Sequence, residues 1–138
     1  MAIFIARSIV RQILIDTNFY VAFKQLNFGA VELLKSVDFI GISTVVLGEL
    51  FAGFRCGSKE ADNRMELEKF LASPRVEPID IDEQTAEFYA EIYRGLRTKG
   101  RPIPTNDLWI AASSLRHGLA VATFDEHFKA VDGLLVVN

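Results

Sequence analysis

The stretch Gln12-Ile13-Leu14-Ile15-Asp16-Thr17-Asn18 contains the signal that decides the fold. Its three consecutive aliphatic residues form a short apolar run, which is typical of a strand buried on both faces of a parallel sheet. Asp16 ends that run, and Thr17-Asn18 can turn the chain into the N-terminus of a helix. We therefore predict a buried strand over residues 12–16 that passes directly into a helix, with a carboxylate at the junction.

The rest of the chain repeats this alternation of short apolar runs and longer amphipathic segments. Further strands are predicted at residues 39–42, 76–81, 119–122 and 134–137. Helices are predicted through residue 35, from 43 or 44 to about 54, over 59–71, from 82 to 100, from 106 to about 117, and around 128. Strands that alternate with helices predict an α/β fold, here a three-layer α/β/α sandwich around a central, mostly parallel sheet of about five strands.

Length and composition indicate one domain. The chain has 138 residues, of which 50% are hydrophobic and 24% charged, and it has no low-complexity linker that would divide it. We expect a single domain over residues 1–138, with residues 1–10 as an N-terminal extension. That apolar start is interrupted by Arg7 and is too short to span a bilayer, so we interpret it as neither a signal peptide nor a membrane anchor.

Charge and cysteine content exclude several classes of protein. The net charge of −3 argues against a chain that coats nucleic acid by bulk electrostatics, so any contact with a polyanion must be local. Cys56 is alone, which excludes an intrachain disulfide and the paired cysteines of a structural zinc site. A reducing cytoplasm fits this content.

Four carboxylates lie inside or at the edge of strongly apolar segments: Asp16, Glu49, Asp107 and Asp125. The functional crevice of an open parallel sheet lies beyond the carboxyl ends of its strands, and Asp16 and Asp125 follow two predicted strands. Asp107 falls in the first turn of a predicted helix, and Glu49 would have to face the crevice from the middle of another. If the four converge, they form an acidic pocket that binds metal.

Each acid also has a structural explanation. Asp16 can form an Asx turn, and Asp125 can cap the short helix that follows it. A carboxylate in a first helical turn, such as Asp107, is favoured by the helix dipole by about 0.3–1 kcal/mol. Glu49 is harder to explain, because an unpaired charge on an apolar helix face costs several kcal/mol unless it is neutralised or bound. Structural roles for all four together are disfavoured.

Four sequence motifs carry a family resemblance. They are ILIDTN at residues 13–18, ELFAG at 49–53, IPTNDLWIAA at 103–112 and TFDEHF at 123–128. Each string alone is weakly specific. In this order and at these separations, they resemble the motifs of the PIN-domain ribonucleases, and most closely those of the VapC-type toxins of toxin–antitoxin pairs. The resemblance covers nearly the whole chain and implies a PIN-like fold. One departure from the family pattern is the extra N-terminal segment.

The resemblance implies a metal-dependent endoribonuclease that hydrolyses RNA phosphodiester bonds. It assigns Asp16, Glu49, Asp107 and Asp125 as ligands of Mg²⁺ or Mn²⁺, directly or through water, and as groups that orient the attacking water. Hard divalent cations offset the repulsion between clustered carboxylates and activate bound water. Three neighbours, Thr17, Asn106 and Thr123, can hydrogen-bond the carboxylates, waters or the scissile phosphate, although capping explains their residue types equally well.

Partners follow from the same resemblance. The substrate would be RNA, and a cognate antitoxin would lay its C-terminal segment across the acidic pocket while its N-terminal part binds operator DNA. Phe51 and Phe54 can contribute to a groove for that partner. A homodimer is also expected, and no membrane. The local run of cations Arg94, Arg97, Lys99 and Arg101 either contacts RNA or completes a solvated helix C-terminus.

Two functions from other classes stay open. One is a PIN-like scaffold that binds RNA or protein without cleaving it. The other is a phosphoacceptor module like a response receiver, which is disfavoured because Asp16 lacks an adjacent acidic partner and Glu49 would be unexplained. His117 and His127 lack the spacing of a metal-binding motif, so surface and helix-end roles are favoured for both.

Overall fold

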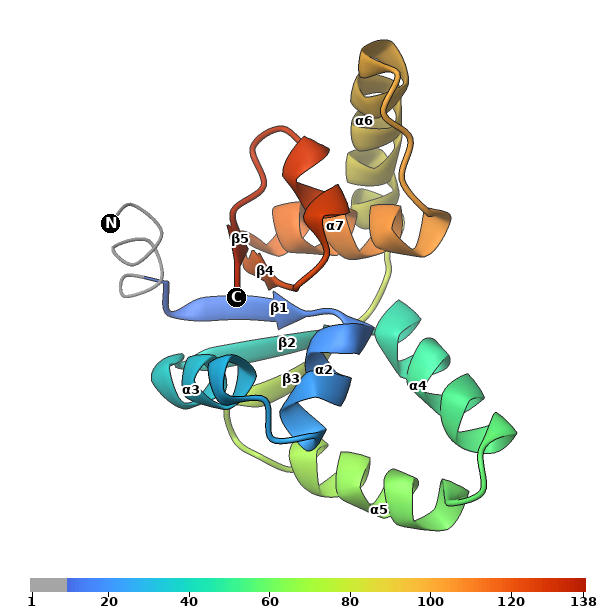
Figure 1. Ribbon diagram of the computed structural model, residues 1–138. Helices are drawn as coiled ribbons and strands as arrows, with labels where there is room; N and C mark the ends of the chain where they lie inside the picture. Colours follow the sequence, from blue (N-terminus) through green and yellow to red (C-terminus); the bar gives the residue numbers. More distant parts are fainter. Residues whose placement is uncertain (1–9) are drawn as a thin grey trace.

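A computed structural model describes residues 10–138, and within them five strands form one parallel sheet (Figure 1). The strands are β1 (Gln12–Ile15), β2 (Phe39–Ser43), β3 (Val76–Ile79), β4 (Ala120–Ala122) and β5 (Val136–Val137). Their order across the sheet is β3-β2-β1-β4-β5, and all four neighbouring pairs are parallel. The predicted α/β architecture is confirmed. Apart from Val10, the predicted N-terminal extension lies outside the described residues.

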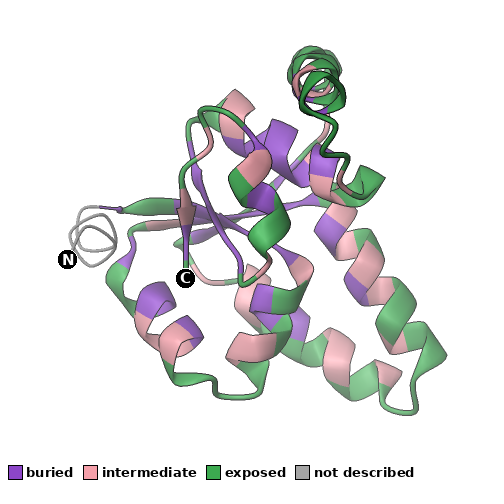
Figure 2. Ribbon diagram, turned by 45° about the horizontal axis from the view of Figure 1, so that its top comes forward, coloured by how far each residue is buried: buried purple, intermediate pink, exposed green. Residues whose placement is uncertain are grey.

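Helices cover both faces of the sheet, with α6 and α7 on one side and α2, α3 and α5 on the other (Figure 1). Their bounds are α2 (Thr17–Lys24), α3 (Phe28–Ser36), α4 (Thr44–Cys56), α5 (Glu60–Leu71), α6 (Glu83–Lys99) and α7 (Thr105–His117), with a 3₁₀ helix, η1 (Glu126–Ala130). Figure 2 shows buried residues along the central strands and exposed residues on the outer faces of the helices. Within residues 10–138, no helix has the length and apolarity needed to cross a lipid bilayer.

The register of the sheet brings the ends of its strands together. In the central strand β1, Ile15 lies beside Ile42 of β2 and Ala122 of β4. The residues that follow these strands, Asp16 and Thr123 among them, therefore emerge at the same carboxyl edge. The aliphatic residues of β1 from 13 to 15 are fully buried, as a central parallel strand requires.

β1 and β4 are each one residue shorter than the sequence predicts, and β3 and β5 are each two residues shorter. β3 ends at Ile79, and β5 contains only residues 136 and 137. β3 lies at the edge of the sheet and contains Pro78, which is tolerated there because an edge strand does not need every N–H for pairing. The segment after β1 is divided into α2 and α3, since the Asn27 side chain accepts a hydrogen bond from the Ala30 N–H at 3.0 Å and starts a new helix.

Candidate active site

Asp16 lies at the junction of β1 and α2 and is only 5% exposed. One carboxylate oxygen, Oδ1, accepts the Phe19 N–H at 2.8 Å and so caps α2. The other, Oδ2, accepts the Thr123 hydroxyl at 2.5 Å, from the end of β4. The capping role expected for Asp16 is present, but the second bond joins two segments that are 107 residues apart in sequence. The carboxylate is thus held in one orientation at the carboxyl edge of the sheet.

Glu49 in α4 joins three helices. Its Oε1 accepts the Thr17 hydroxyl at 2.5 Å, at the start of α2, and its Oε2 accepts the Asn106 side-chain N–H at 3.2 Å, at the start of α7. Neither Thr17 nor Asn106 is the N-cap of its helix, since those positions belong to Asp16 and Pro104. Both polar side chains are therefore used to hold Glu49 rather than to cap a helix.

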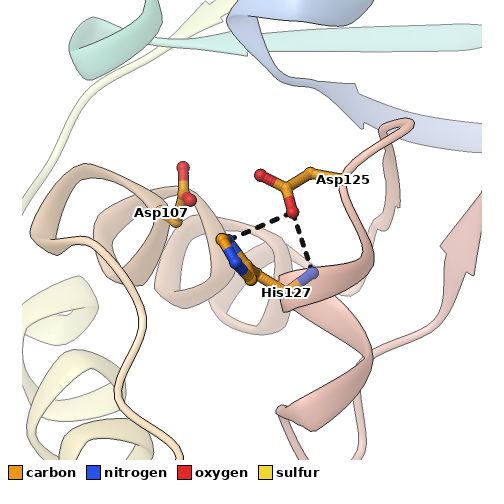
Figure 3. A group of neighbouring side chains, drawn as sticks. All are labelled: Asp107, Asp125 and His127. Atoms are coloured by element: carbon orange, nitrogen blue, oxygen red, sulfur yellow. Dashed lines mark hydrogen bonds and ion pairs between the residues drawn. The ribbon is translucent and has the colours of Figure 1, made fainter.

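Asp107 and Asp125 approach each other from α7 and the β4–η1 connection, and His127 joins them (Figure 3). Asp125 caps η1, because its Oδ1 accepts the His127 backbone N–H at 2.8 Å. The His127 ring nitrogen Nδ1 lies 3.2 Å from the same oxygen. One potential ligand atom from each of the three side chains lies within 4.8 Å of the other two. The first turn of α7 thus faces the end of β4.

The four acids form one electrostatic cluster. Burial, followed by the charges of Asp125, Asp16 and Glu49, raises the pKa of Asp107 to about 6, and His127 opposes the rise. The pKa of Asp16 is also raised, first by burial and then by the charges of Asp125 and Glu49, against its hydrogen bonds from Thr123 and Phe19. Asp107 and Asp16 therefore both resist ionisation, first because they are buried and then because other acids lie close to them.

This donor set fits a divalent cation. Crowded carboxylates in a partly buried pocket are destabilised when all are ionised, and a hard cation that prefers oxygen ligands offsets that repulsion. The ligand atoms of Asp107, Asp125 and His127 lie within 4.8 Å of one another, close to the span of one coordination sphere. The sequence analysis favoured a surface role for His127, and the structure places this exposed side chain beside the acids. The sequence motifs for metal-binding histidines pair a histidine with another histidine or with cysteines, whereas the neighbours of His127 are the carboxylates of Asp107 and Asp125.

The basic run at the end of α6 does not join the acidic cluster. Arg94 is paired with Glu91 at 2.6 Å, and Lys99 is paired with Asp132 at 2.5 Å. Among residues 10–138, no hydrogen bond or ion pair links the run to the four acids. Figure 1 shows the C-terminal end of α6 pointing away from the sheet. A role for this run in RNA binding stays a prediction.

Comparison with known proteins identifies relatives along nearly the whole chain. The PIN domain family matches residues 13–134. Ribonuclease VapC4 from Mycobacterium tuberculosis is 31% identical over 129 residues, which cover 94% of this chain and 98% of that protein. Ribonuclease VapC2 from Rickettsia felis is 32% identical, over 80% of this chain and 82% of that protein.

A solved structure of VapBC2 from Rickettsia felis, bound to a DNA fragment from its promoter, superposes with a TM-score of 0.81. The two chains are 30% identical, and the match covers 92% of this chain and 98% of the other. The family match, the shared fold and the convergent acids agree with one another. The protein belongs to the PIN domain family and is similar to its VapC-type members.

Proposed function

We propose that this protein is a metal-dependent endoribonuclease and the toxin of a toxin–antitoxin pair. The observation that carries the proposal is the convergence of Asp16, Glu49, Asp107 and Asp125, from four separate segments, on one edge of the sheet. The names of the relatives support the choice of RNA as substrate, because VapC4 and VapC2 are both ribonucleases. Helix capping by Asp16 and Asp125 accounts for each residue alone, but it does not account for the gathering of four acids in one place.

The carboxylates would hold Mg²⁺ or Mn²⁺, with Asp16, Asp107 and Asp125 as the first candidates for direct ligands. A bound divalent ion supplies a water of lowered pKa and offsets the charge that develops on the leaving oxygen of a phosphodiester. Glu49 differs from the other acids, since Thr17 and Asn106 hold both of its oxygens. We assign Glu49 to orienting the attacking water or accepting its proton, directly or through the ion's water shell.

Thr123 is a positioning residue in this proposal. Its hydroxyl donates to Asp16 at 2.5 Å and accepts the Asp125 backbone N–H at 2.9 Å. One buried side chain therefore links the Asp16 carboxylate to the backbone of Asp125. Hydrogen-bonded support of this kind keeps ligands in place when the ion is absent and limits the reorganisation needed on binding.

A protein antitoxin is the partner that the relatives support, because VapBC-5 from Mycobacterium tuberculosis is a member of the VapBC family of toxin–antitoxin systems and the VapBC2 structure is bound to promoter DNA. A groove of about 270 Å³ lies between α2 and the α4–α5 pair, lined by Tyr20, Val21, Lys24, Gln25, Phe54, Asn63 and Glu66. Phe54 lines it, whereas Phe51 is covered by the Arg64 guanidinium, 4.3 Å from the ring centroid. We assign this groove to the antitoxin, with operator DNA bound by the complex.

We also propose that the chain acts as one domain in the cytoplasm. Buried apolar residues from β1 through β5 form a continuous core within residues 10–138. The free and exposed Cys56 fits a reducing compartment, where cellular RNA is also available.

The test is cleavage of total cellular RNA by purified, antitoxin-free protein in Mg²⁺, in Mn²⁺ and in chelator. Asp16→Asn is the variant, and Asp38→Asn is the matched control, because Asp38 is an exposed residue whose side chain pairs with Arg11 on the surface. We expect discrete fragments that require metal, persist in the control and vanish in Asp16→Asn. Binding of RNA without any cleavage by the folded protein would instead indicate a non-catalytic PIN-like scaffold.

A further inference from the structure

We propose that His127 is a nitrogen ligand in the acidic pocket and that it makes the pocket select first-row transition ions, such as Mn²⁺, over Mg²⁺. This inference rests on the proposed function, because it concerns the ion held by the same carboxylates. It goes beyond that function by adding a ligand of different chemistry and by deciding which class of ion the pocket prefers.

The geometry places the imidazole within reach of the ion. Candidate ligand atoms of Asp107, Asp125 and His127 lie within 4.8 Å of one another. Two ligands bonded to one ion at about 2.1 Å can be at most about 4.2 Å apart, so the gap to be closed is a few tenths of an ångström. The His127 side chain is 59% exposed, and its ring is free to make that small rotation.

The backbone around His127 sets the side of the pocket on which its ring lies. Asp125 caps η1 by accepting the His127 backbone N–H, which puts the two side chains on the same side of the first turn. In Figure 3, the Asp125 carboxylate and the His127 ring both lie opposite Asp107. Within residues 10–138, the ring makes no other hydrogen bond or ion pair than the one with Asp125, so one ring nitrogen stays available.

The donor atoms of the pocket determine whether it prefers Mg²⁺ or a transition ion such as Mn²⁺. Mg²⁺ demands oxygen ligands in near-ideal octahedral geometry and keeps much of its water. Imidazole nitrogen is a poor ligand for Mg²⁺ but a common one for transition ions. A pocket made only of carboxylates would discriminate weakly between Mg²⁺ and Mn²⁺, whereas one with an added imidazole favours the transition ion.

A purely structural role for His127 makes a different prediction. If the ring only pairs with Asp125 at the start of η1, its removal changes the local stability and leaves the bound ion coordinated by oxygen alone. The two roles are therefore separated by identifying the atoms bonded to the ion, which does not depend on measuring activity.

The experiment is electron paramagnetic resonance of Mn²⁺ bound to the full-length, metal-stripped protein. Pulsed measurements detect a nitrogen-14 nucleus bonded to Mn²⁺, and titration gives the affinity. The variants are His127→Ala and His127→Gln, and the matched control is His117→Ala, because His117 is an exposed histidine at the end of α7. Circular dichroism checks that each variant is folded.

We expect a nitrogen signal in the wild type and in His117→Ala that is absent from both His127 variants. The Mn²⁺ affinity of those variants should fall by about tenfold or more, while the Mg²⁺ affinity, measured by competition, changes by less than about twofold. Wild-type protein that binds Mn²⁺ without a nitrogen signal, or His127→Ala with unchanged Mn²⁺ affinity, would overturn the inference.

The variant Asp107→Asn shows whether a negative result refutes only the role of His127 or the acidic metal site as well. If Asp107→Asn loses Mn²⁺ binding while the nitrogen signal is absent from the wild type, the acidic pocket stands and only the role of His127 is wrong. If Asp107→Asn binds Mn²⁺ as tightly as the wild type, the ion is not held by this pocket, and both the proposed site and the role of His127 fail.

Discussion

Neutralising Asp107 should stabilise the metal-free protein. The carboxylate has a folded-state pKa of about 6 against an ordinary value of 3.8, so at neutral pH the folded protein holds a charge that its surroundings disfavour. That difference corresponds to at most about 3 kcal/mol. Because Asp107 is only partly buried, solvent screening reduces the expected effect to about 1 kcal/mol. For a domain of this size, this is a rise in Tm of about 3–5 °C.

The assay is calorimetric unfolding of the wild type and Asp107→Asn in chelator at about pH 7.5, repeated with saturating Mg²⁺ or Mn²⁺. The wild type should gain stability from the ion, whereas the variant should gain little. Asp82→Asn provides a control of opposite sign. Asp82 caps α6 by accepting the Thr85 N–H at 2.8 Å, and this bond lowers its pKa, so its neutralisation should lower the Tm.

Two results would refute the reasoning. A lower Tm for metal-free Asp107→Asn would show that the carboxylate stabilises the fold, against the repulsion inferred from its neighbours. Equal stabilisation of variant and wild type by the ion would show that Asp107 does not bind it.

Three further predictions concern Asp107, Thr123 and Gly41. The stabilising effect of Asp107→Asn should shrink as the pH falls from about 7 to about 4. Over that range the folded wild type takes up a proton at Asp107, which the unfolded chain binds only at lower pH. A Tm difference between variant and wild type that stays constant with pH would contradict this. Thr123→Val keeps the shape of a buried side chain but removes its bonds to Asp16 and Asp125, so urea unfolding should show a loss of about 1–3 kcal/mol, and an unchanged midpoint would argue against it. Gly41→Ala should lower the free energy of unfolding by about 1–3 kcal/mol in the same assay, because the new Cβ would lie 2.5 Å from Ile79 Cδ1. Gly95→Ala on α6 is the control, because its Cβ would meet open space and the change should be neutral or stabilising.

The position of Asp16 could be predicted from sequence because its signals are local. An apolar run of three residues followed by a capping carboxylate defines both the strand and its end, and parallel pairing with β4 then places Thr123 beside it. The same reasoning located Asp125 after β4. Neither inference required knowledge of how the helices pack.

The surroundings of Glu49 could not be predicted in the same way. Its hydrogen bonds to Thr17 and Asn106 depend on the angle at which α4 leaves the sheet, and that angle is set by packing between distant segments. His127 was missed for a related reason. Its position relative to Asp107 depends on the turn into η1 and on the placement of α7, and no spacing along the chain encodes it.

The most direct test of the acidic site is anomalous diffraction from crystals of the protein soaked in Mn²⁺. We predict a strong anomalous peak among the carboxylates of Asp16, Asp107 and Asp125, on the side of Asp107 that faces His127. Crystals saturated with Mn²⁺ that show no peak at these carboxylates, or a peak only elsewhere on the molecule, would contradict the claim that acids from separate segments build one metal centre.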